Sequence, residues 1–325
     1  MMKVFATVAR IMAGVLLAAI AGSATAQQAY PNKPIRFITA NAPGGSTSRL
    51  AGLIGQNLTE RWGQQVIVDN RPGGNGFIGG ETLAKASPDG YSIMIVTSTH
   101  IITPLLLRAP YDTIKDFAPV VTVASARQLM VLHPSVPANS LQEFIALAKS
   151  MPGQLNYAAT GTGGMQHLSG ELFGMLTGVK IQLIPYKGGA PALTDLLGGR
   201  IQLTIQSPLG PIPYVKGGKL KAIAITGETR LSTLPQVPTF AEAGLPGFDV
   251  KNWYGILAPA STPKAIIDKL SAEVARIMVV PDIQEKLVGQ GLDSFISTPE
   301  QFAALIKTDI TKFAKIIKTA NIRIE

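Results

Sequence analysis

Ala42-Pro43-Gly44-Gly45-Ser46-Thr47-Ser48 is the stretch that decides the fold, and Thr160-Gly161-Thr162-Gly163-Gly164 repeats its character. Each is a loop of small residues between a short apolar strand and an amphipathic helix. The unpaired N–H groups at a helix start and the helix macrodipole both favour an anion. Two such helix starts that face each other would hold a carboxylate without a metal or a charged side chain.

The residues around the first loop support this interpretation. Ile35–Ala40 has the length and the β-branched content of a buried strand. The following helix is predicted from apolar residues at spacings of three and four, with N-cap oxygens in Ser46–Ser48 and Gly63 at the C′ position. These apolar residues are Leu50, Leu53, Ile54, Leu58 and Trp62.

The second loop has the same surroundings. Asn156–Ala159 is a predicted strand, an apolar stripe recurs at every fourth residue, and Gly178 follows the last helical turn. The stripe consists of Leu168, Leu172 and Leu176. The alternative is that both loops are ordinary connections between a strand and a helix.

Strands and helices alternate along most of the chain, which predicts an α/β fold with mostly parallel sheets. Helices are expected at Leu141–Lys149 and Pro191–Leu197, and the segment Pro263–Asn321 is expected to hold helices without a strand. The length of 325 residues predicts two domains. Further strands are expected at Gln65–Asp69, Ser92–Thr97, Leu129–His133, Ile181–Pro185, Ile201–Gln206, Ala222–Thr226 and Trp253–Ala258.

The N-terminus has the features of an export signal. A basic start with Lys3 and Arg10 precedes the apolar stretch Ile11–Ile20, and Ala24-Thr25-Ala26 offers a small-residue cleavage site. We therefore expect a signal peptide over residues 1–26, cleavage near Ala26 and a periplasmic location. The absence of cysteine is compatible with export.

Composition restricts the partners. The net charge of +9, or +7 without Lys3 and Arg10, favours anions. The basic residues are dispersed, without a basic run or an aromatic platform, so nucleic acid is not expected. No cysteine and three scattered histidines give no metal-ligand spacing. No cofactor or metal is expected.

Motifs typical of enzymes carry little weight here. Gly74-Asn75-Gly76-Phe77-Ile78-Gly79 matches the dinucleotide-binding pattern, but it does not emerge directly from a strand and no acidic residue follows at the expected distance. A structural glycine turn is the preferred interpretation. No nucleophile elbow occurs in the sequence.

Several motifs together resemble the solute-binding receptors of tripartite tricarboxylate transporters, also called Bug proteins. They follow the family's order over essentially the whole mature chain. They are Ala42-Pro43-Gly44-Gly45, Asn70-Arg71-Pro72-Gly73, Pro88-Asp89-Gly90-Tyr91, Tyr157–Glu171, Pro185-Tyr186-Lys187-Gly188, Val237-Pro238-Thr239 and Glu242-Ala243-Gly244.

The resemblance implies a type II periplasmic binding protein, with two α/β lobes joined by two crossing segments and a ligand cleft between them. We expect one domain of residues 27–127 plus 255–325 and a second of residues 128–254. It also implies capture of a small carboxylate for membrane partners, by a protein expected to be a monomer. The resemblance further implies that backbone amides of the two loops hold the ligand's carboxylate. In this chain they are Ala42, Gly44, Gly45 and Ser46 in the first loop, and Thr160, Gly161, Thr162, Gly163 and Gly164 in the second.

Two departures from the family bear on the ligand. Ser48, and Gln206 with Ser207, stand where the family commonly has acidic residues. An acid there would pair with a ligand ammonium group, so we expect a carboxylate without an amino group, aromatic or dicarboxylic.

Other candidate ligand contacts have weaker support. Ser98, Thr99 and His100 follow a strand end, where ligands gather in open α/β sheets. Lys187, beside Tyr186, is a candidate partner for a second anionic group, or is simply solvated. Pro43 and His167 complete the predicted site because they lie in the two loop regions.

Two other function classes remain open from the sequence. A ligand-sensing subunit would bind the same solute but report to a signalling partner. A periplasmic hydrolase or isomerase would use the same cleft and turn its ligand over, whereas a receptor returns it unchanged.

Overall fold

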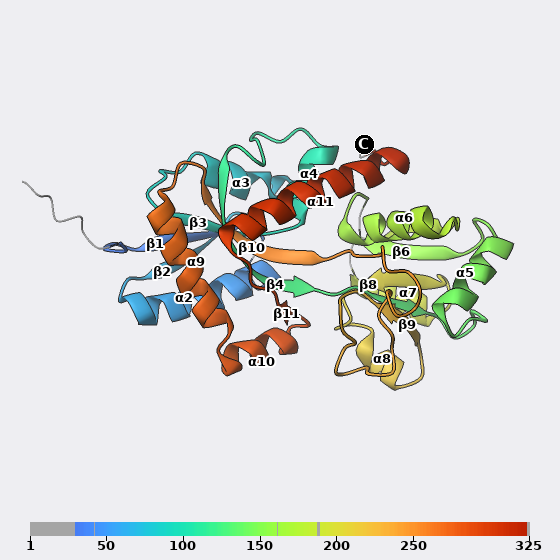
Figure 1. Cartoon of the computed structure of the whole chain (residues 1–325). Helices are drawn as coiled ribbons and strands as arrows, with labels where there is room; N and C mark the ends of the chain where they lie inside the picture. Colours follow the sequence, from blue (N-terminus) through green and yellow to red (C-terminus); the bar gives the residue numbers. More distant parts are fainter. Residues whose placement is uncertain (1–29, 42, 161, 187–188, 324–325) are drawn as a thin grey trace, which may run out of the picture.

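Two β-sheets, each flanked by helices, organise the chain in the computed structural model (Figure 1). The structure describes residues 30–41, 43–160, 162–186 and 189–323. The predicted signal peptide, residues 1–26, lies outside the described residues. We call the half built on the six-stranded sheet the first lobe and the half built on the five-stranded sheet the second lobe.

The first lobe has the strand order β11-β4-β10-β3-β1-β2. Its strands are β1 (Ile35–Thr39), β2 (Val66–Asn70), β3 (Ser92–Thr97), β4 (Phe117–Ala126), β10 (Asn252–Pro259) and β11 (Asp293–Ser294). Its helices are α2 (Ser46–Trp62), α3 (Phe77–Ala84), α4 (Thr99–Leu106), α9 (Lys264–Met278), α10 (Pro281–Gly289) and α11 (Pro299–Thr319), with a 3₁₀ turn η1 (Gly74–Gly76).

The second lobe has the strand order β7-β6-β8-β5-β9. Its strands are β5 (Leu129–Leu132), β6 (Asn156–Thr160), β7 (Gln182–Tyr186), β8 (Leu203–Gln206) and β9 (Lys221–Ile225). Its helices are α5 (Leu141–Ser150), α6 (Met165–Thr177), α7 (Gly189–Leu197) and α8 (Ile212–Lys216).

Each sheet is mixed, which corrects the expectation of mostly parallel sheets. The βα units keep β1 parallel to β2 and β3, and β6 parallel to β7 and β8. The strands next to the lobe crossings pair antiparallel, because the chain leaves the first lobe along β4 and returns along β10. Ala126 pairs with Asn252, so the outgoing and returning segments lie side by side.

The domain boundaries placed at 127/128 and 254/255 stay a prediction. Strand β10 begins at Asn252 within the first sheet, three residues before the expected return point. The nine strands that the sequence predicts are present, with ends that differ by two residues or fewer.

Two further strands were not predicted. Strand β4 is buried along most of its length, so its apolar run lacks the alternation of a half-exposed strand, and Pro119 argues against a strand from sequence alone. The register shift between Ile256 and Leu257, opposite Pro119, shows how the sheet accommodates this proline. Strand β11 corrects the expectation that the segment after Pro263 contains none.

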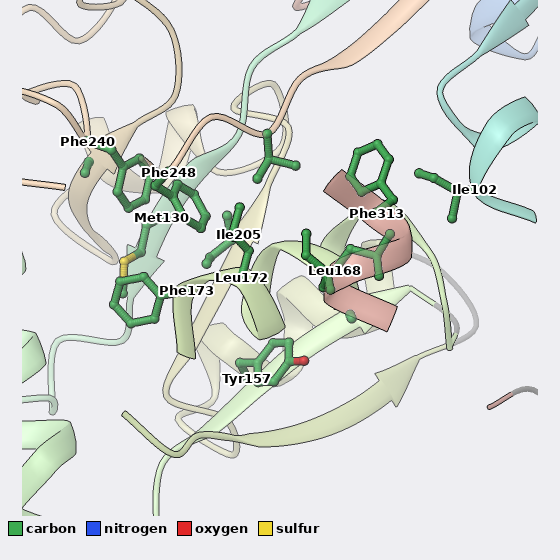
Figure 2. Packing of buried hydrophobic residues seen from close by; sticks show 14 of the residues in the cluster. Ile102, Met130, Tyr157, Leu168, Leu172, Phe173, Ile205, Phe240, Phe248 and Phe313 are labelled. Carbon is green, nitrogen blue, oxygen red and sulfur yellow. The ribbon is translucent and has the colours of Figure 1, made fainter. Parts of the chain in front are cut away.

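Helix α11 joins the lobes through the hydrophobic core. It contacts α4 in the first lobe and α6 in the second (Figure 1). Figure 2 shows Phe313 of α11 between Ile102 of α4 and Leu168 of α6, and all three belong to one buried cluster. A second cluster lies within the first lobe and a third within the second.

Candidate ligand-binding cavity

A cavity of about 620 Å³ opens where the two lobes meet. The first lobe contributes the carboxyl ends of β1 and β3, the position where ligands bind in open α/β sheets. The second lobe contributes the loop before α6. The described residues that line it are Ala40, Asn41, Ser46, Thr47, Gly73, Asn75, Gly76, Met94, Ile95, Val96, Thr97, Thr99, His100, Thr103, Leu106, Leu107, Tyr111, Thr162, Gly163, Gly164, Asn252 and Tyr254.

Helix α2 begins at this cavity without a side-chain cap. Its N-cap is Gly45, in extended backbone, and its first turn contains no acidic residue. The first main-chain bond of the helix runs from the Arg49 N–H to the Gly45 carbonyl, so the preceding N–H groups of the turn have no intrahelical partner. The sequence predicted a cap from Ser46–Ser48, but these residues lie inside the helix.

The Thr47 side chain is turned away from any capping role. Its Oγ1 lies 2.7 Å from Oγ1 of Thr39, and both residues are buried. This hydrogen bond joins the first turn of α2 to the end of β1. The helix start is therefore held in place against the sheet edge while its N–H groups stay available.

Helix α6 begins at the same cavity in the same way. Its N-cap is Gly164, in extended backbone, without a side-chain cap and without an acidic residue in the first turn. By contrast, α5 is capped by the Ser140 hydroxyl, and α11 has a complete capping box from Thr298 and Gln301. Helices α3, α4, α8, α9 and α10 also lack a side-chain cap, so what distinguishes α2 and α6 is that their uncapped starts lie at the same cavity, one from each lobe.

The loop before α6 is fixed by a buried histidine. The Gly163 N–H donates to Nδ1 of His167 at 2.9 Å. The other ring nitrogen of His167 lies 3.6 Å from Oε1 of Glu171, which also accepts from the Tyr157 hydroxyl at 3.1 Å. Gly163 therefore lines the cavity, but its N–H is already used, and its φ of +78° requires glycine.

Residues of β10 form part of the cavity wall between the two helix starts. The buried Ser98 hydroxyl donates to Oδ1 of Asn252 at 2.7 Å, which orients the Asn252 amide group. The Tyr254 hydroxyl donates to Oγ of Ser46 at 3.2 Å. Burial raises the pKa of Tyr254, so this side chain keeps its proton and contributes no charge to the wall.

The far part of the cavity is bounded by α4 and an aromatic cluster. The ring of His100 stacks on Tyr111 at 5.3 Å and meets Phe117 edge-on at 4.9 Å. Burial lowers the pKa of His100 to about 4 and raises that of Tyr111 to about 12. Both groups are therefore neutral near pH 7, as expected in a region of low polarity.

The structure brings part of the predicted site together. Ser46, Thr99, His100, Thr162, Gly163 and Gly164 line the cavity. Other predicted residues lie in the described part of the chain but are not among its lining residues: Pro43, Gly44, Gly45, Ser48, Ser98, His167, Tyr186, Gln206 and Ser207. The main chain of Thr160 ends β6, and its side chain lies outside the described part of the structure. Ala42, Gly161 and Lys187 lie outside the described residues.

Two of the non-lining residues form side-chain hydrogen bonds elsewhere. Ser98 supports Asn252, and the Tyr186 hydroxyl donates to Oδ2 of Asp195 at 2.7 Å. Gln206 is buried at the end of β8, and its Nε2 has no hydrogen-bond partner among the described residues. Leu176, predicted in the apolar stripe of α6, is 43% exposed and is not part of the core.

Sequence reasoning missed much of the wall. The Gly73–Gly76 turn was interpreted as structural, and it does form a 3₁₀ turn with left-handed residues, but Gly73, Asn75 and Gly76 also line the cavity. Tyr254 was predicted as part of the strand Trp253–Ala258, without a ligand contact. Only the pairing of β10 with β3 brings Asn252 and Tyr254 to this edge, and no local pattern signals it.

The described residues include no group of three or more histidine or acidic side chains placed to hold a metal ion. Within the same residues, no helix combines the length and apolar character needed to cross a membrane.

Two α/β lobes with a cavity at their junction define the class of the protein: a two-lobed periplasmic binding protein. The chain belongs to the family described as "Tripartite tricarboxylate transporter family receptor", whose sequence profile matches residues 50–322. This is a family of solute-binding receptors, so the chain is a receptor and not an enzyme.

Relatives cover nearly the whole chain. Protein BugT of Bordetella pertussis is 33% identical, over 91% of this chain and 92% of its own length. The solved structure of R. palustris Rpa4515 with adipate is 34% identical, with a TM-score of 0.74, over 90% of this chain and 99% of that chain. MatC from Rhodopseudomonas palustris with bound malate is 30% identical, with a TM-score of 0.70, over 89% of this chain and 100% of that chain.

Proposed function

We propose that this receptor captures a small carboxylate in the cavity between its lobes and passes it to the membrane components of a tripartite tricarboxylate-type transporter. The observation that carries the proposal is the pair of uncapped helix starts, α2 and α6, at one cavity. Relatives solved with adipate and with malate support a carboxylate. The predicted signal peptide supports a periplasmic location.

The hydrogen-bond donors at this cavity are numerous enough to bind a carboxylate with micromolar affinity. A hydrogen bond to a charged group contributes roughly 1.5–3 kcal/mol, and a helix terminus adds about 0.3–1 kcal/mol. Three or four such donors approach the roughly 8 kcal/mol of a micromolar complex before the entropy of binding is subtracted. Ser46, Thr97 and Thr162 line the same cavity, and a hydroxyl group can donate a further hydrogen bond to a carboxylate.

An amino group on the ligand is disfavoured. None of the described residues that line the cavity is acidic, so an ammonium group would lose its hydration without gaining a charged partner. Ser48 and Gln206, which stand where the family commonly has acids, add no negative charge either. We propose a carboxylate without an amino group.

Titration calorimetry with a matched pair tests this proposal. Glutarate and glutamate differ by one amino group, and we expect glutarate to bind more tightly. Tighter binding of glutamate would contradict the preference for non-amino ligands. Binding of neither these acids nor any other carboxylate in a panel of aliphatic and aromatic acids would contradict the proposed function.

The membrane partner needs a separate test. Affinity capture from solubilised membranes, with the receptor as bait, is expected to recover transporter components. Recovery of a signalling receptor instead would favour the sensing role. Native mass spectrometry of the freshly purified protein would identify a retained ligand and also test the expected monomer.

A further inference from the structure

The cavity extends well beyond the helix starts that hold the proposed carboxylate. Helix α4 presents one face to it, from Thr99 near the sheet edge to Leu106 at the other end of the helix, and Leu107 follows directly after the helix. Seven residues of an α-helix span about 10 Å. A ligand whose carboxylate lies at the helix starts therefore has its far end against the second half of α4.

The far end is built for a neutral group. Leu106, Leu107 and Tyr111 line it together with His100. The Tyr111 ring meets both Phe77 and Phe117 edge-on, at 5.9 and 5.1 Å between centroids. Of the described residues that line the cavity, none carries a lysine, arginine, aspartate or glutamate side chain.

The polar groups of His100 and Tyr111 in this region carry no positive charge. Nδ1 of His100 lies 3.4 Å from the Tyr111 hydroxyl, and its Nε2 is buried without a partner among the described residues. The low pKa of His100 and the high pKa of Tyr111 both reflect burial, which also penalises a second carboxylate. A carboxylate placed here would lose its water without meeting a cation among the described lining residues.

We infer that the receptor selects monocarboxylates with an apolar body, such as a hydrocarbon chain or a ring, over dicarboxylates of the same length. This inference rests on the proposed function, because it assumes that the α2 and α6 helix starts hold the first carboxylate. The cavity volume of about 620 Å³ is within the range of sites that enclose small organic ligands.

Three six-carbon probes test the inference by titration calorimetry on the full-length mature protein. Hexanoate and adipate differ only in the far end, and hexanoate and hexanamide differ only in the charge at the near end. We expect hexanoate to bind at least about tenfold more tightly than adipate and than hexanamide. A ring-bearing acid, 3-phenylpropanoate, is expected to bind at least as tightly as hexanoate.

The outcomes distinguish a failure of the monocarboxylate preference from a failure of the proposed function. If hexanoate binds less than about tenfold more tightly than adipate, or if adipate binds more tightly, this inference is overturned and the proposed function stays in place. Equal binding of hexanoate and hexanamide, or no binding of any acid, overturns the proposed function and this inference together. An adipate preference that is lost in Lys187→Ala would place the second anion at Lys187, and it too overturns the inference.

A charge-introducing variant locates the far end. Leu107→Arg places a cation on the half-buried end of α4, and we expect it to shift the hexanoate-to-adipate affinity ratio at least about tenfold toward adipate. Ile114→Arg adds the same charge at an exposed site outside the cavity and is expected to leave the ratio unchanged. If a folded Leu107→Arg protein, checked by thermal unfolding, keeps the wild-type ratio, the ligand does not extend along α4 and the inference fails.

Discussion

Gly45 and Gly164 are N-caps that provide no side-chain acceptor. Their backbone angles, with φ of −65° and −76°, suit ordinary residues as well as glycine. Backbone conformation therefore does not require glycine at these positions, whereas a Ser, Thr, Asp or Asn side chain there would accept hydrogen bonds from the first-turn N–H groups. The absence of a cap keeps these donors available to a guest.

Substituting aspartate at either N-cap tests whether glycine keeps the first-turn N–H groups available to the ligand. In Gly45→Asp and Gly164→Asp the new carboxylate would accept from the helix start and occupy the place of the bound anion. We expect hexanoate affinity to fall at least about tenfold, while the melting temperature stays the same or rises, since an N-cap contributes about 1 kcal/mol. Calorimetry and thermal unfolding measure the two effects.

The matched control is Gln65→Asp, which adds the same charge at an exposed position outside the cavity. It should leave hexanoate affinity close to the wild-type value. Undiminished affinity in both N-cap variants would show that these helix starts do not hold the anion. Gly163 is unsuitable for such a test, because its positive φ would strain any substitute.

His100 makes the stability of the protein depend on pH. Burial lowers its pKa to about 4, whereas an unfolded histidine titrates near 6.5. Below pH 6.5 the unfolded chain binds a proton that the folded protein excludes. The stabilisation is thus fully present above pH 6.5 and is lost as the pH falls toward 4.

We expect His100 alone to cost about 2 kcal/mol of unfolding free energy between pH 7 and pH 5. Urea denaturation of the wild type and of His100→Gln at the two pH values measures this. The wild type should lose more stability than the variant over this interval. An equal loss in both proteins would mean that His100 is not the group responsible.

At the scale of elements, the paired loops and helices and the strand β10 were predictable, whereas the strand β4 and the position of β10 in the sheet were not. The strand–loop–helix units around Gly45 and Gly164 have local signals: an apolar strand, small residues and a 3.6-residue stripe. Strand β4 and the return of β10 depend on partners far away in the sequence. Asn252 and Tyr254 of β10 line the cavity, and this part of its wall could not be deduced from local pattern.

A buried carboxylate of helix α11 forms a hydrogen bond to strand β10, one of the two strands along which the chain passes between the lobes. Asp309 is 3% exposed and accepts from the Trp253 indole N–H at 2.8 Å and from Nζ of Lys312 at 2.7 Å. The Lys312 ammonium group also donates to the main-chain carbonyl of Asp249, on the segment that returns to the first lobe. These contacts connect the helix that spans both lobes with one of the two crossings.

Asp309→Ala should therefore destabilise the protein. The substitution leaves the buried Trp253 N–H without an acceptor and Lys312 without its carboxylate, and we expect a loss of about 2–4 kcal/mol. Chemical denaturation measures it against Asp282→Ala, which removes only an exposed pair with Lys286 and should cost less than about 0.5 kcal/mol. Equal losses in the two variants would contradict a structural role for Asp309.

For the whole molecule, the buried cluster that includes residues of both lobes predicts cooperative unfolding. Scanning calorimetry should show one transition, because neither lobe can lose its structure without exposing part of this shared core. Ligand at a hundred times its dissociation constant should stabilise that single transition by about 2.7 kcal/mol. Two resolved transitions, only one of them sensitive to the ligand, would contradict this expectation.

The most direct measurement is a crystal structure of the receptor with the tightest-binding carboxylate of the panel. It should place the carboxylate oxygens within about 3.2 Å of N–H groups in the first turns of α2 and α6, with the rest of the ligand along α4. A carboxylate paired instead with a lysine or arginine side chain, away from both helix starts, would contradict the account.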